Sequence, residues 1–287
     1  LINMKHIFLL LISALLIFAC SSDDSTSDDD NNNSSLLVSR MIEESLDQED
    51  YSEYNFSYNG NKLNQIIINR YSSSEGAFAG VPERYKYEYY YTSDKISLIQ
   101  EHEYSEATNS YYLTKYYELE YDSQGRFILN SSYDSNGTLD ALTSVNWNSD
   151  GSCNVIVEAA QNTSDLEVES TAVYNFNNNG DTSNSQVNYD IYDEDNCIPI
   201  TISLQYDNNN GAFKNITSTE GFSALFVVVD YIPANNNALS WSQNSQCDDL
   251  NGVISWSYDY NEDGYPLTSI KRINNEPDTI ITFEYLD

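Results

Sequence analysis

Long stretches of the chain alternate between aromatic or apolar residues and polar ones. Between residues 85 and 91, tyrosine stands at every odd position, with lysine and glutamate at 86 and 88. Residues 254–260 repeat the pattern with Ile, Trp and two Tyr at the even positions. Successive side chains of a strand point to opposite faces, so this two-residue period predicts β-strands with one buried face. No segment after Ser35 keeps a helical period, although residues 36–46 fit either a short helix or an opening strand.

One phrase recurs through residues 36–287. An aromatic-x-aromatic run is followed by a cluster of Asn, Asp, Ser or Gly, and then by an apolar residue that begins a second alternating run. Asn, Asp and Gly tolerate the positive φ that tight hairpin turns demand. The predicted turns lie near Gly60, Asp94, Gly125, Gly151, Gly180, Gly211, Asn237 and Gly264. This spacing indicates a repeat architecture, so we predict an all-β fold of consecutive antiparallel β-hairpin repeats forming an extended twisted sheet.

The N-terminal region has a different pattern. A basic end at Lys5 precedes a mainly apolar run at residues 7–18, which is followed by the small residue Ala19 and by Cys20. A basic end, an apolar core of roughly 7–15 residues and a small residue at the cleavage site are typical of a secretory signal peptide. The run is shorter than the roughly 20 residues of a transmembrane helix. Ile17-Phe18-Ala19-Cys20 resembles a bacterial lipobox, so we predict a signal peptide at residues 1–19 and lipid attachment at Cys20.

Residues 20–35 form a polar run of Ser, Asp and Asn. A segment with low hydrophobicity and many like charges buries too little apolar surface to offset the entropy lost on ordering. The composition therefore predicts a flexible tether. The start Cys20-Ser21-Ser22-Asp23-Asp24 resembles the surface-export signal of lipoproteins in Bacteroidota. The resemblance implies a protein anchored in the outer membrane and displayed on the cell surface. A tether that faces the periplasm is the alternative.

Charge and composition narrow the classes of molecule that the protein can bind. The chain has 45 acidic and 12 basic side chains and a net charge of −33. Such a field repels nucleic acid and anionic lipid head groups, so no nucleic-acid partner is expected and the lipid anchor supplies the membrane contact. No Pro- or Gly-rich linker divides the chain after Ser35, so residues 36–287 are predicted to form one continuous domain.

The cysteines allow a disulfide without selecting it. Once Cys20 is acylated, Cys153, Cys197 and Cys247 remain. Outside the cytoplasm two of them can pair, but the sequence does not say which two. None stands in a CxxC arrangement or beside a histidine, so no zinc site is predicted.

One turn carries a family resemblance. Tyr121-Asp122-Ser-Gln-Gly125-Arg126-Phe127 resembles the YD repeat of Rhs and teneurin shells, and residues 36–287 resemble YD-repeat-like surface lipoproteins of Bacteroidota. The resemblance implies stacked antiparallel hairpins in an extended, twisted sheet. It carries over no catalytic residue, because the role of that repeat is structural.

Residues that commonly perform catalysis are scarce. The predicted mature chain has a single histidine, His102, and on a strand its neighbours Glu101 and Glu103 point to the opposite face. We interpret His102 as a solvent-facing strand residue. The sequence contains no GxSxG, HExxH, P-loop or dinucleotide fingerprint. Two carboxylates can hydrolyse glycosides, but the many acidic residues nominate no particular pair.

A calcium site is the sharper candidate. Asp259, Asn261 and Asp263 have the spacing of the first half of an EF-hand loop. The twelfth position, where that loop has a bidentate Glu, is Ile270. The same spacing arises wherever a strand runs into an Asn/Asp/Gly turn. These three residues are the metal ligands that the sequence suggests, with hairpin-turn chemistry as the alternative, and no other cofactor is predicted.

The sequence predicts a non-enzymatic cell-envelope lipoprotein with a binding or structural role toward a glycan or protein ligand. The alternative is a carbohydrate-active lipoprotein, which binds glycan for an uptake system or hydrolyses glycosides. Aromatic rings stack on sugar faces while their polar tips form hydrogen bonds. An aromatic row exposed on one sheet face would favour glycan binding, and a cleft with two facing carboxylates would favour hydrolysis.

Overall fold

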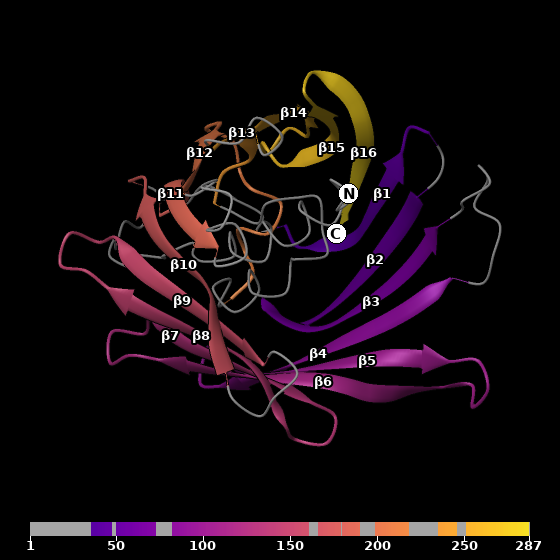
Figure 1. Cartoon of the computed structure of the whole chain (residues 1–287). Helices are drawn as coiled ribbons and strands as arrows, with labels where there is room; N and C mark the ends of the chain where they lie inside the picture. Colours follow the sequence, from indigo (N-terminus) through magenta and orange to yellow (C-terminus); the bar gives the residue numbers. More distant parts are fainter. Residues whose placement is uncertain are drawn as a thin grey trace, which may run out of the picture.

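The chain folds into antiparallel β-strands that close into one barrel (Figure 1). The computed structural model describes residues 36–47, 50–72, 82–160, 166–178, 180–189, 199–217, 235–245 and 251–286. The strands are β1 (Val38–Ser45), β2 (Asp50–Asn59), β3 (Lys62–Ser72), β4 (Glu83–Thr92), β5 (Lys95–Ser105), β6 (Ser110–Tyr121), β7 (Phe127–Asp134), β8 (Leu139–Trp147), β9 (Cys153–Ala160), β10 (Leu166–Phe176), β11 (Thr182–Tyr189), β12 (Ile200–Tyr206), β13 (Ala238–Asn244), β14 (Gly252–Tyr260), β15 (Pro266–Ile273) and β16 (Glu276–Tyr285). The described residues contain no helix that is long and apolar enough to cross a membrane.

The prediction of an all-β fold with consecutive antiparallel hairpins is confirmed, and the prediction of an extended twisted sheet is wrong. β1 pairs with β16 from Val38 opposite Tyr285 to Ser45 opposite Thr279, so the sheet closes on itself. An open sheet would leave a row of unpaired N–H and C=O groups at each edge, and closure removes both rows. Residues 36–46, which the sequence left ambiguous, supply the closing strand.

Several hairpins share one five-residue turn. Among the described residues it occurs at 122–126, 134–138, 148–152, 177–181 and 261–265, always with Asp or Asn first and Gly fourth. The first residue donates its N–H to the carbonyl of the fifth at 2.8–3.0 Å. The glycine N–H donates to the carbonyl of the first residue at 3.0–3.2 Å. The glycine φ lies between 76° and 88°, a left-handed conformation that strains other residues.

The predicted turns near Gly60, Asp94, Gly125, Gly151, Gly180 and Gly264 are confirmed. Gly211 and Asn237 do not separate successive described strands, because both lie in one connection between β12 and β13. The Oδ1 atom of Asp207 accepts from the backbone N–H of Asn209 and of Asn237, each at 3.0 Å. The N–H of Asp207 donates in turn to the carbonyl of Asn237 at 3.0 Å. Asn237 thus takes the place of the fifth turn residue, and residues 211–236 interrupt the turn.

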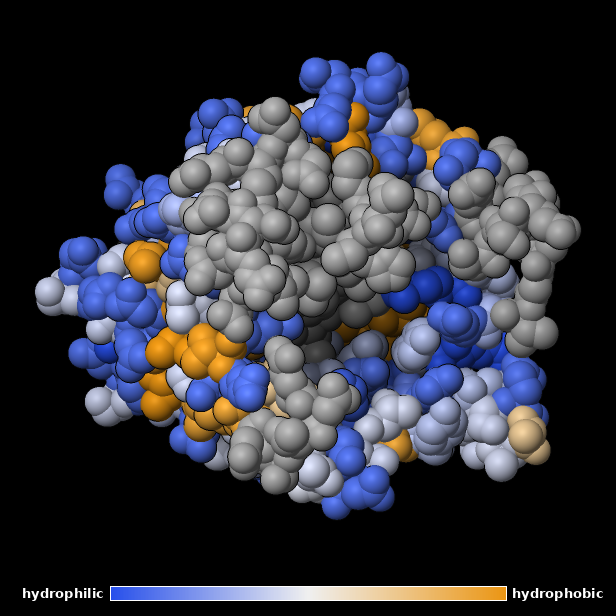
Figure 2. Space-filling view, viewed as in Figure 1, coloured by the Kyte–Doolittle hydropathy of each residue, from blue (hydrophilic) through white to orange (hydrophobic). Residues whose placement is uncertain are grey.

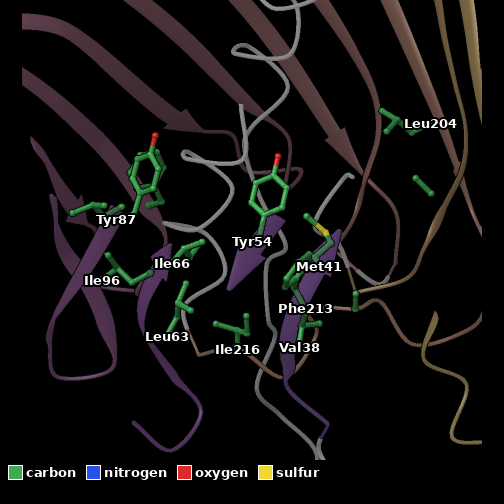
Figure 3. Close-up of a cluster of buried hydrophobic side chains, with 14 of the residues drawn as sticks. Val38, Met41, Tyr54, Leu63, Ile66, Tyr87, Ile96, Leu204, Phe213 and Ile216 are labelled. Carbon is green, nitrogen blue, oxygen red and sulfur yellow. The ribbon is translucent and has the colours of Figure 1, made fainter. Parts of the chain in front are cut away.

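The first part of this insertion, residues 211–217, enters the barrel, and we call it the plug segment. Phe213 is 1% exposed and packs against Phe56 of β2, with ring centroids 5.6 Å apart. Figure 3 places Phe213 and Ile216 among the buried side chains of the first strands. The N–H of Thr217 donates to the carbonyl of Asn61 in the β2–β3 turn at 2.9 Å. The plug segment therefore joins the end of β12 to β2 through the interior.

The apolar core fills the barrel, and the outer wall is mainly polar. Along β12, the aliphatic residues at 200, 202 and 204 are buried, whereas Thr, Ser and Gln at 201, 203 and 205 are exposed. Along β14, Ile254 and Trp256 are buried while Ser257 and Asp259 are exposed. Figure 2 shows hydrophilic residues over much of the coloured surface in that view. Along these two strands the alternation sends most apolar groups inward and most polar groups outward, with Val253 as an outward apolar residue.

The aromatic residues before the turns hold neighbouring strands together. In several hairpins, an aromatic residue near the end of an even-numbered strand donates from its polar tip to a backbone carbonyl near the start of the preceding strand, at 2.7–3.0 Å. The pairs are Tyr58 to Val38, Tyr121 to Ile96, Trp147 to Phe127, Tyr258 to Ala238 and Tyr285 to Pro266. Each ring is partly buried against the core while its polar tip is satisfied. This arrangement explains the aromatic residue in the repeated phrase.

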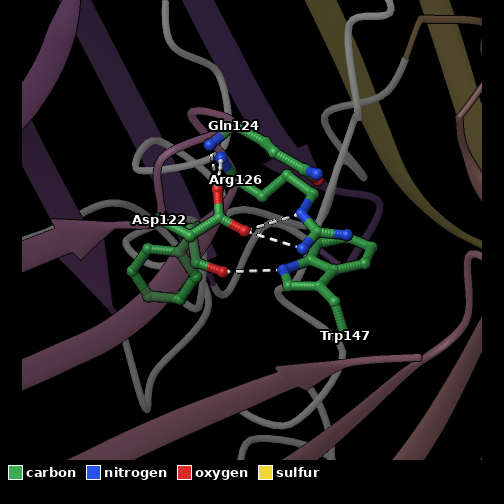
Figure 4. A network of polar contacts seen from close by, with 5 residues as sticks. Asp122, Gln124, Arg126 and Trp147 are labelled. Atoms are coloured by element: carbon green, nitrogen blue, oxygen red, sulfur yellow. Dashed lines mark hydrogen bonds and ion pairs between the residues drawn. The ribbon is translucent and has the colours of Figure 1, made fainter. Parts of the chain in front are cut away.

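The turn after β6 is held by a side-chain network (Figure 4). The Oδ1 atom of Asp122 accepts from the backbone N–H groups of Gln124 at 2.8 Å and Arg126 at 2.9 Å. Its Oδ2 atom pairs with the Arg126 guanidinium, at 2.8 Å from Nε and 2.7 Å from Nη2. The guanidinium lies 5.2 Å from the ring centroid of Trp147 on the next hairpin. The same contact recurs between Lys62 and Tyr91 and between Lys95 and Tyr121. The residue after the turn thus packs one hairpin against the next.

Candidate functional site

Tyrosines occupy both faces of the wall in the first part of the barrel. The inward row on β4 includes Tyr87 and Tyr89, both buried, as the alternation predicted. The register sends a second set outward. Tyr116 pairs with Tyr133, for example, while the next residue on β6, Tyr117, packs against the core. We call this outward set the outer tyrosine face: Tyr51, Tyr71, Tyr90, Tyr104, Tyr111, Tyr116 and Tyr133.

Rings of the outer tyrosine face meet across neighbouring strands. Tyr116 and Tyr133 are stacked, with centroids 4.8 Å apart and planes 12° apart. Two further pairs meet edge to face, namely Tyr51 with Tyr71 at 5.6 Å and Tyr104 with Tyr111 at 5.3 Å. Cross-strand aromatic pairs contribute roughly 0.2–1 kcal/mol each. Tyr90 is 45% exposed, so its ring remains open to solvent.

Polar side chains lie between these rings. The hydroxyl of Tyr90 donates to the Oε1 atom of Gln100 at 3.2 Å. The Glu88 carboxylate contacts both Lys86 and His102. The Nζ atom of Lys86 and the Nε2 atom of His102 each lie 3.0 Å from its Oε2 atom. The face therefore offers amide, carboxylate, imidazole and hydroxyl groups beside aromatic rings.

Two bases lie over rings of the outer tyrosine face. The Arg84 guanidinium is 4.8 Å from the ring centroid of Tyr104, and the Lys86 ammonium is 5.5 Å from that of Tyr111. Cation–π contacts of this kind help to orient these half-buried rings. The rings are therefore held in place by neighbours on adjacent strands.

His102 lies on the outer wall, but it is less exposed than predicted. Its side chain is 14% exposed because it packs beside Lys86 and Glu88. Burial and the nearby Lys86 lower the pKa of His102, although Glu88 opposes them, so the imidazole is neutral at neutral pH. Glu101 points to the interior, where it accepts the Tyr117 hydroxyl at 2.7 Å. That direction confirms the predicted alternation around His102.

Strands β8–β16 have a different exterior. Among the side chains that the structure describes, none of the outward positions on these strands holds an aromatic residue. Representative outward residues are Asn146, Asn154, Asn175, Asn184, Ser203, Ser242, Ser257, Thr268 and Thr282. This half of the barrel therefore closes without outward rings, and the outer tyrosine face is confined to β2–β7.

The three residues proposed for calcium lie at the β14–β15 hairpin. Asp259 points outward, and its Oδ2 atom accepts from the Thr268 hydroxyl at 3.1 Å. The Oδ1 atom of Asn261 accepts from the backbone N–H groups of Asp263 at 3.0 Å and Tyr265 at 2.9 Å. These contacts are those of the hairpin-turn alternative. Among the described residues, no group of three or more His, Cys, Asp and Glu could hold a metal ion. Calcium binding stays a prediction.

The cysteine predictions fall mostly outside the described residues. Cys20, Cys197 and Cys247 lie there, as do the predicted signal peptide and tether at residues 1–35. Cys153 begins β9, where it is buried and free. Burial raises the pKa of its thiol to about 12, so the thiol stays protonated and unreactive.

Comparisons with known proteins identify the fold. No protein-family model and no curated protein matches the chain. A porin-like protein from Bacteroides uniformis is similar with a TM-score of 0.52 and 11% sequence identity, over 87% of this chain and 98% of that one. A porin-like protein from Bacteroides vulgatus has a TM-score of 0.33 and 10% identity, over 88% and 99% of the chains. A Bacteroides fragilis protein of unknown function has a TM-score of 0.32 and 12% identity, over 37% and 81%.

These similarities establish the fold of the chain. The last two TM-scores are too low to support an argument, and the identity to the first protein is too low to transfer a function. The comparisons do not support the resemblance to YD-repeat proteins. The antiparallel hairpins that the resemblance implied are present, but they form a closed barrel. The chain therefore shares its barrel fold with a porin-like protein of Bacteroides uniformis, and its function has to be argued from its own residues.

Proposed function

We propose that the chain is a lipoprotein of the outer membrane whose barrel stands in water, and that its role is to bind a ligand rather than to catalyse a reaction. The polarity of the wall is the observation that carries this proposal. A barrel that spans a membrane presents an apolar band about 25 Å tall to the lipid and has a polar interior. This barrel has an apolar interior of buried aliphatic and aromatic side chains, and its outer wall carries many Ser, Thr, Asn and Gln residues beside the outer tyrosine face and scattered aliphatic residues.

Charged side chains on the outer wall support the same proposal. Lys86 and Glu88 point outward from β4, and Glu118 points outward from β6. On the lipid face of a membrane-spanning barrel, a single Lys or Arg near the midplane costs about 2–4 kcal/mol. Water imposes no such cost. The acyl chains on Cys20 would then hold the protein at the membrane, with residues 20–35 as the tether.

Two of the described interior carboxylates are engaged by tyrosine hydroxyls. Glu43 and Glu101 both face the interior, and each accepts a hydrogen bond from a tyrosine hydroxyl. Tyr54 donates to Glu43 at 2.9 Å, and Tyr117 donates to Glu101 at 2.7 Å. Figure 3 shows the hydroxyls of Tyr54 and Tyr87 pointing away from the apolar group around Val38. Glycan binding is the second candidate, and the outer tyrosine face is the observation that favours it.

Protease treatment of intact cells tests the surface location. Protease should remove the barrel from intact cells while a periplasmic marker survives, because the tether would display the barrel on the outside. Replacing the predicted lipid-bearing residue, Cys20→Ala, should abolish labelling by radioactive palmitate and leave an uncleaved precursor. The matched control Cys153→Ala removes a buried thiol and should leave labelling intact. Full protection from protease with normal labelling would refute the surface location, and labelling that survives Cys20→Ala would refute the anchor.

A further inference from the structure

We propose that the outer tyrosine face binds a neutral polysaccharide. This inference rests on the proposed binding role and names both its site and its ligand class. It starts from the unequal distribution of rings over a wall that is otherwise built from one repeating hairpin.

The barrel itself does not require outward rings. On strands β8–β16 the described outward positions hold polar, charged and aliphatic side chains, such as Asn146, Val173 and Thr282, and none of them is aromatic. On β2–β7 the equivalent positions hold seven tyrosines. The inward aromatic residues of the same strands already supply the buried rings and the hairpin contacts. Rings that are gathered on one side of a surface, and that the core does not use, mark an interaction site.

The chemistry of the face matches a sugar chain. A pyranose ring has two C–H faces that pack on an aromatic ring and an equatorial belt of hydroxyls that form hydrogen bonds. Exposed Tyr90 lies beside Gln100, and stacked Tyr116 and Tyr133 continue the row across the next strands. The Nε2 atom of His102 lies 3.0 Å from Glu88, which leaves the Nδ1 atom of the neutral ring as an acceptor. The polar groups are therefore of the kind that bind hydroxyls.

Charge selects a neutral ligand. The net charge of −33 repels anionic polysaccharides and most acidic proteins at long range. Within the face, Lys86 and Glu88 form an ion pair at 3.0 Å, so neither charge is left to recruit an ionic ligand. A neutral polysaccharide pays no electrostatic cost on approach. It also presents repeated sugar faces to repeated rings.

Affinity electrophoresis of the full-length protein tests this proposal. The protein, kept in mild detergent, is run through native gels that contain starch, mannan, mixed-linkage β-glucan or arabinoxylan, with alginate as the anionic comparison. At least one neutral polymer should slow the protein, and alginate should not. The double variant Tyr116→Ala/Tyr133→Ala should weaken that binding at least tenfold. Tyr90→Ala should also weaken it, and this single change at an exposed position leaves the stacked pair in place.

The control variant changes strands β13 and β14, which lie outside the outer tyrosine face. Leu239→Ala/Val253→Ala removes two side chains that are 37% and 43% exposed, and it should leave binding unchanged. The proposal is overturned if no neutral polymer slows the protein, or if both tyrosine variants bind as the unaltered chain does. Dimerisation that depends on Tyr116 and Tyr133, seen by gel filtration, would assign the face to a second copy instead. None of these results would change the outcome of the protease test, which concerns surface display and not ligand binding.

Discussion

Replacing the buried ring of the plug segment, Phe213→Ala, should destabilise the barrel by about 3–5 kcal/mol, the usual cost of removing a buried aromatic side chain from a packed core. Phe213 is 1% exposed and lies against Phe56 of β2. A sixteen-stranded barrel encloses more space than the side chains of its own wall readily fill. The plug segment supplies part of the missing volume, so its largest apolar side chain should carry a large share of the packing. Denaturant unfolding followed by tyrosine and tryptophan fluorescence measures the effect.

The neighbouring residue provides the control. Lys214 is exposed in the same segment, and Lys214→Ala should change stability by less than about 0.5 kcal/mol. A loss below about 1 kcal/mol for Phe213→Ala would mean that the plug segment adds little to the core. Equal losses for the two variants would lead to the same conclusion.

Replacing a buried carboxylate, Asp181→Asn, should stabilise the protein at neutral pH. Asp181 is 1% exposed, and its Oδ2 atom has no hydrogen-bond partner among the described residues. The N–H of Asn235 donates to its Oδ1 atom at 2.7 Å. Burial raises the pKa of Asp181 from 3.8 to about 6, although the backbone N–H of Asn235 opposes the change. Asparagine keeps an oxygen for Asn235 and carries no charge.

The pH dependence follows from that direction. Between its unfolded pKa and its raised folded pKa, Asp181 binds more proton in the folded state. The contribution of Asp181 to stability is therefore greatest below about pH 4 and is lost as pH rises through about 6, by about 3 kcal/mol at most. Asp181→Asn should remove this fall, and unfolding measured from pH 4 to 8 shows whether it does.

A second carboxylate provides a control of opposite sign. The backbone N–H of Thr138 lowers the pKa of Asp134, so Asp134→Asn should lower stability at neutral pH instead of raising it. If the stability of Asp181→Asn matched that of the unaltered protein at every pH, Asp181 would not be a source of the pH dependence.

Much of the local structure could be predicted from the sequence, because strands and turns have short-range signals. The alternating residues at 85–91 and 254–260 identify the buried faces of β4 and β14. Glycine after Asn or Asp identifies the tight turns, since few other residues adopt positive φ. The interrupted turn was misread for the same reason. Asp207 and Asn237 each look like a turn residue, but together they close a single turn across an insertion.

Closure of the barrel and the position of the outer tyrosine face could not be predicted, because both depend on strand pairing that a local sequence pattern does not contain. The pairing of β1 with β16 joins opposite ends of the domain, and no short motif records it. The outward rings did leave a signal, because Tyr89-Tyr90-Tyr91 and Tyr116-Tyr117 place tyrosines on both faces of a strand. Only the register shows that outward rings from β2 to β7 share one side of the wall.

Release of the barrel from the membrane tests the central claim most directly, namely that a polar-walled barrel is held at the outer membrane only by an anchor at Cys20. A specific protease site is placed within residues 25–31 of the predicted tether, and outer-membrane fractions are cleaved without detergent and centrifuged. The account predicts that the barrel moves to the supernatant and keeps the circular dichroism spectrum of a β-sheet protein, because its outer wall is polar. A cleaved barrel that stays in the pellet until detergent is added would show that the wall itself is embedded in lipid, which would contradict the account.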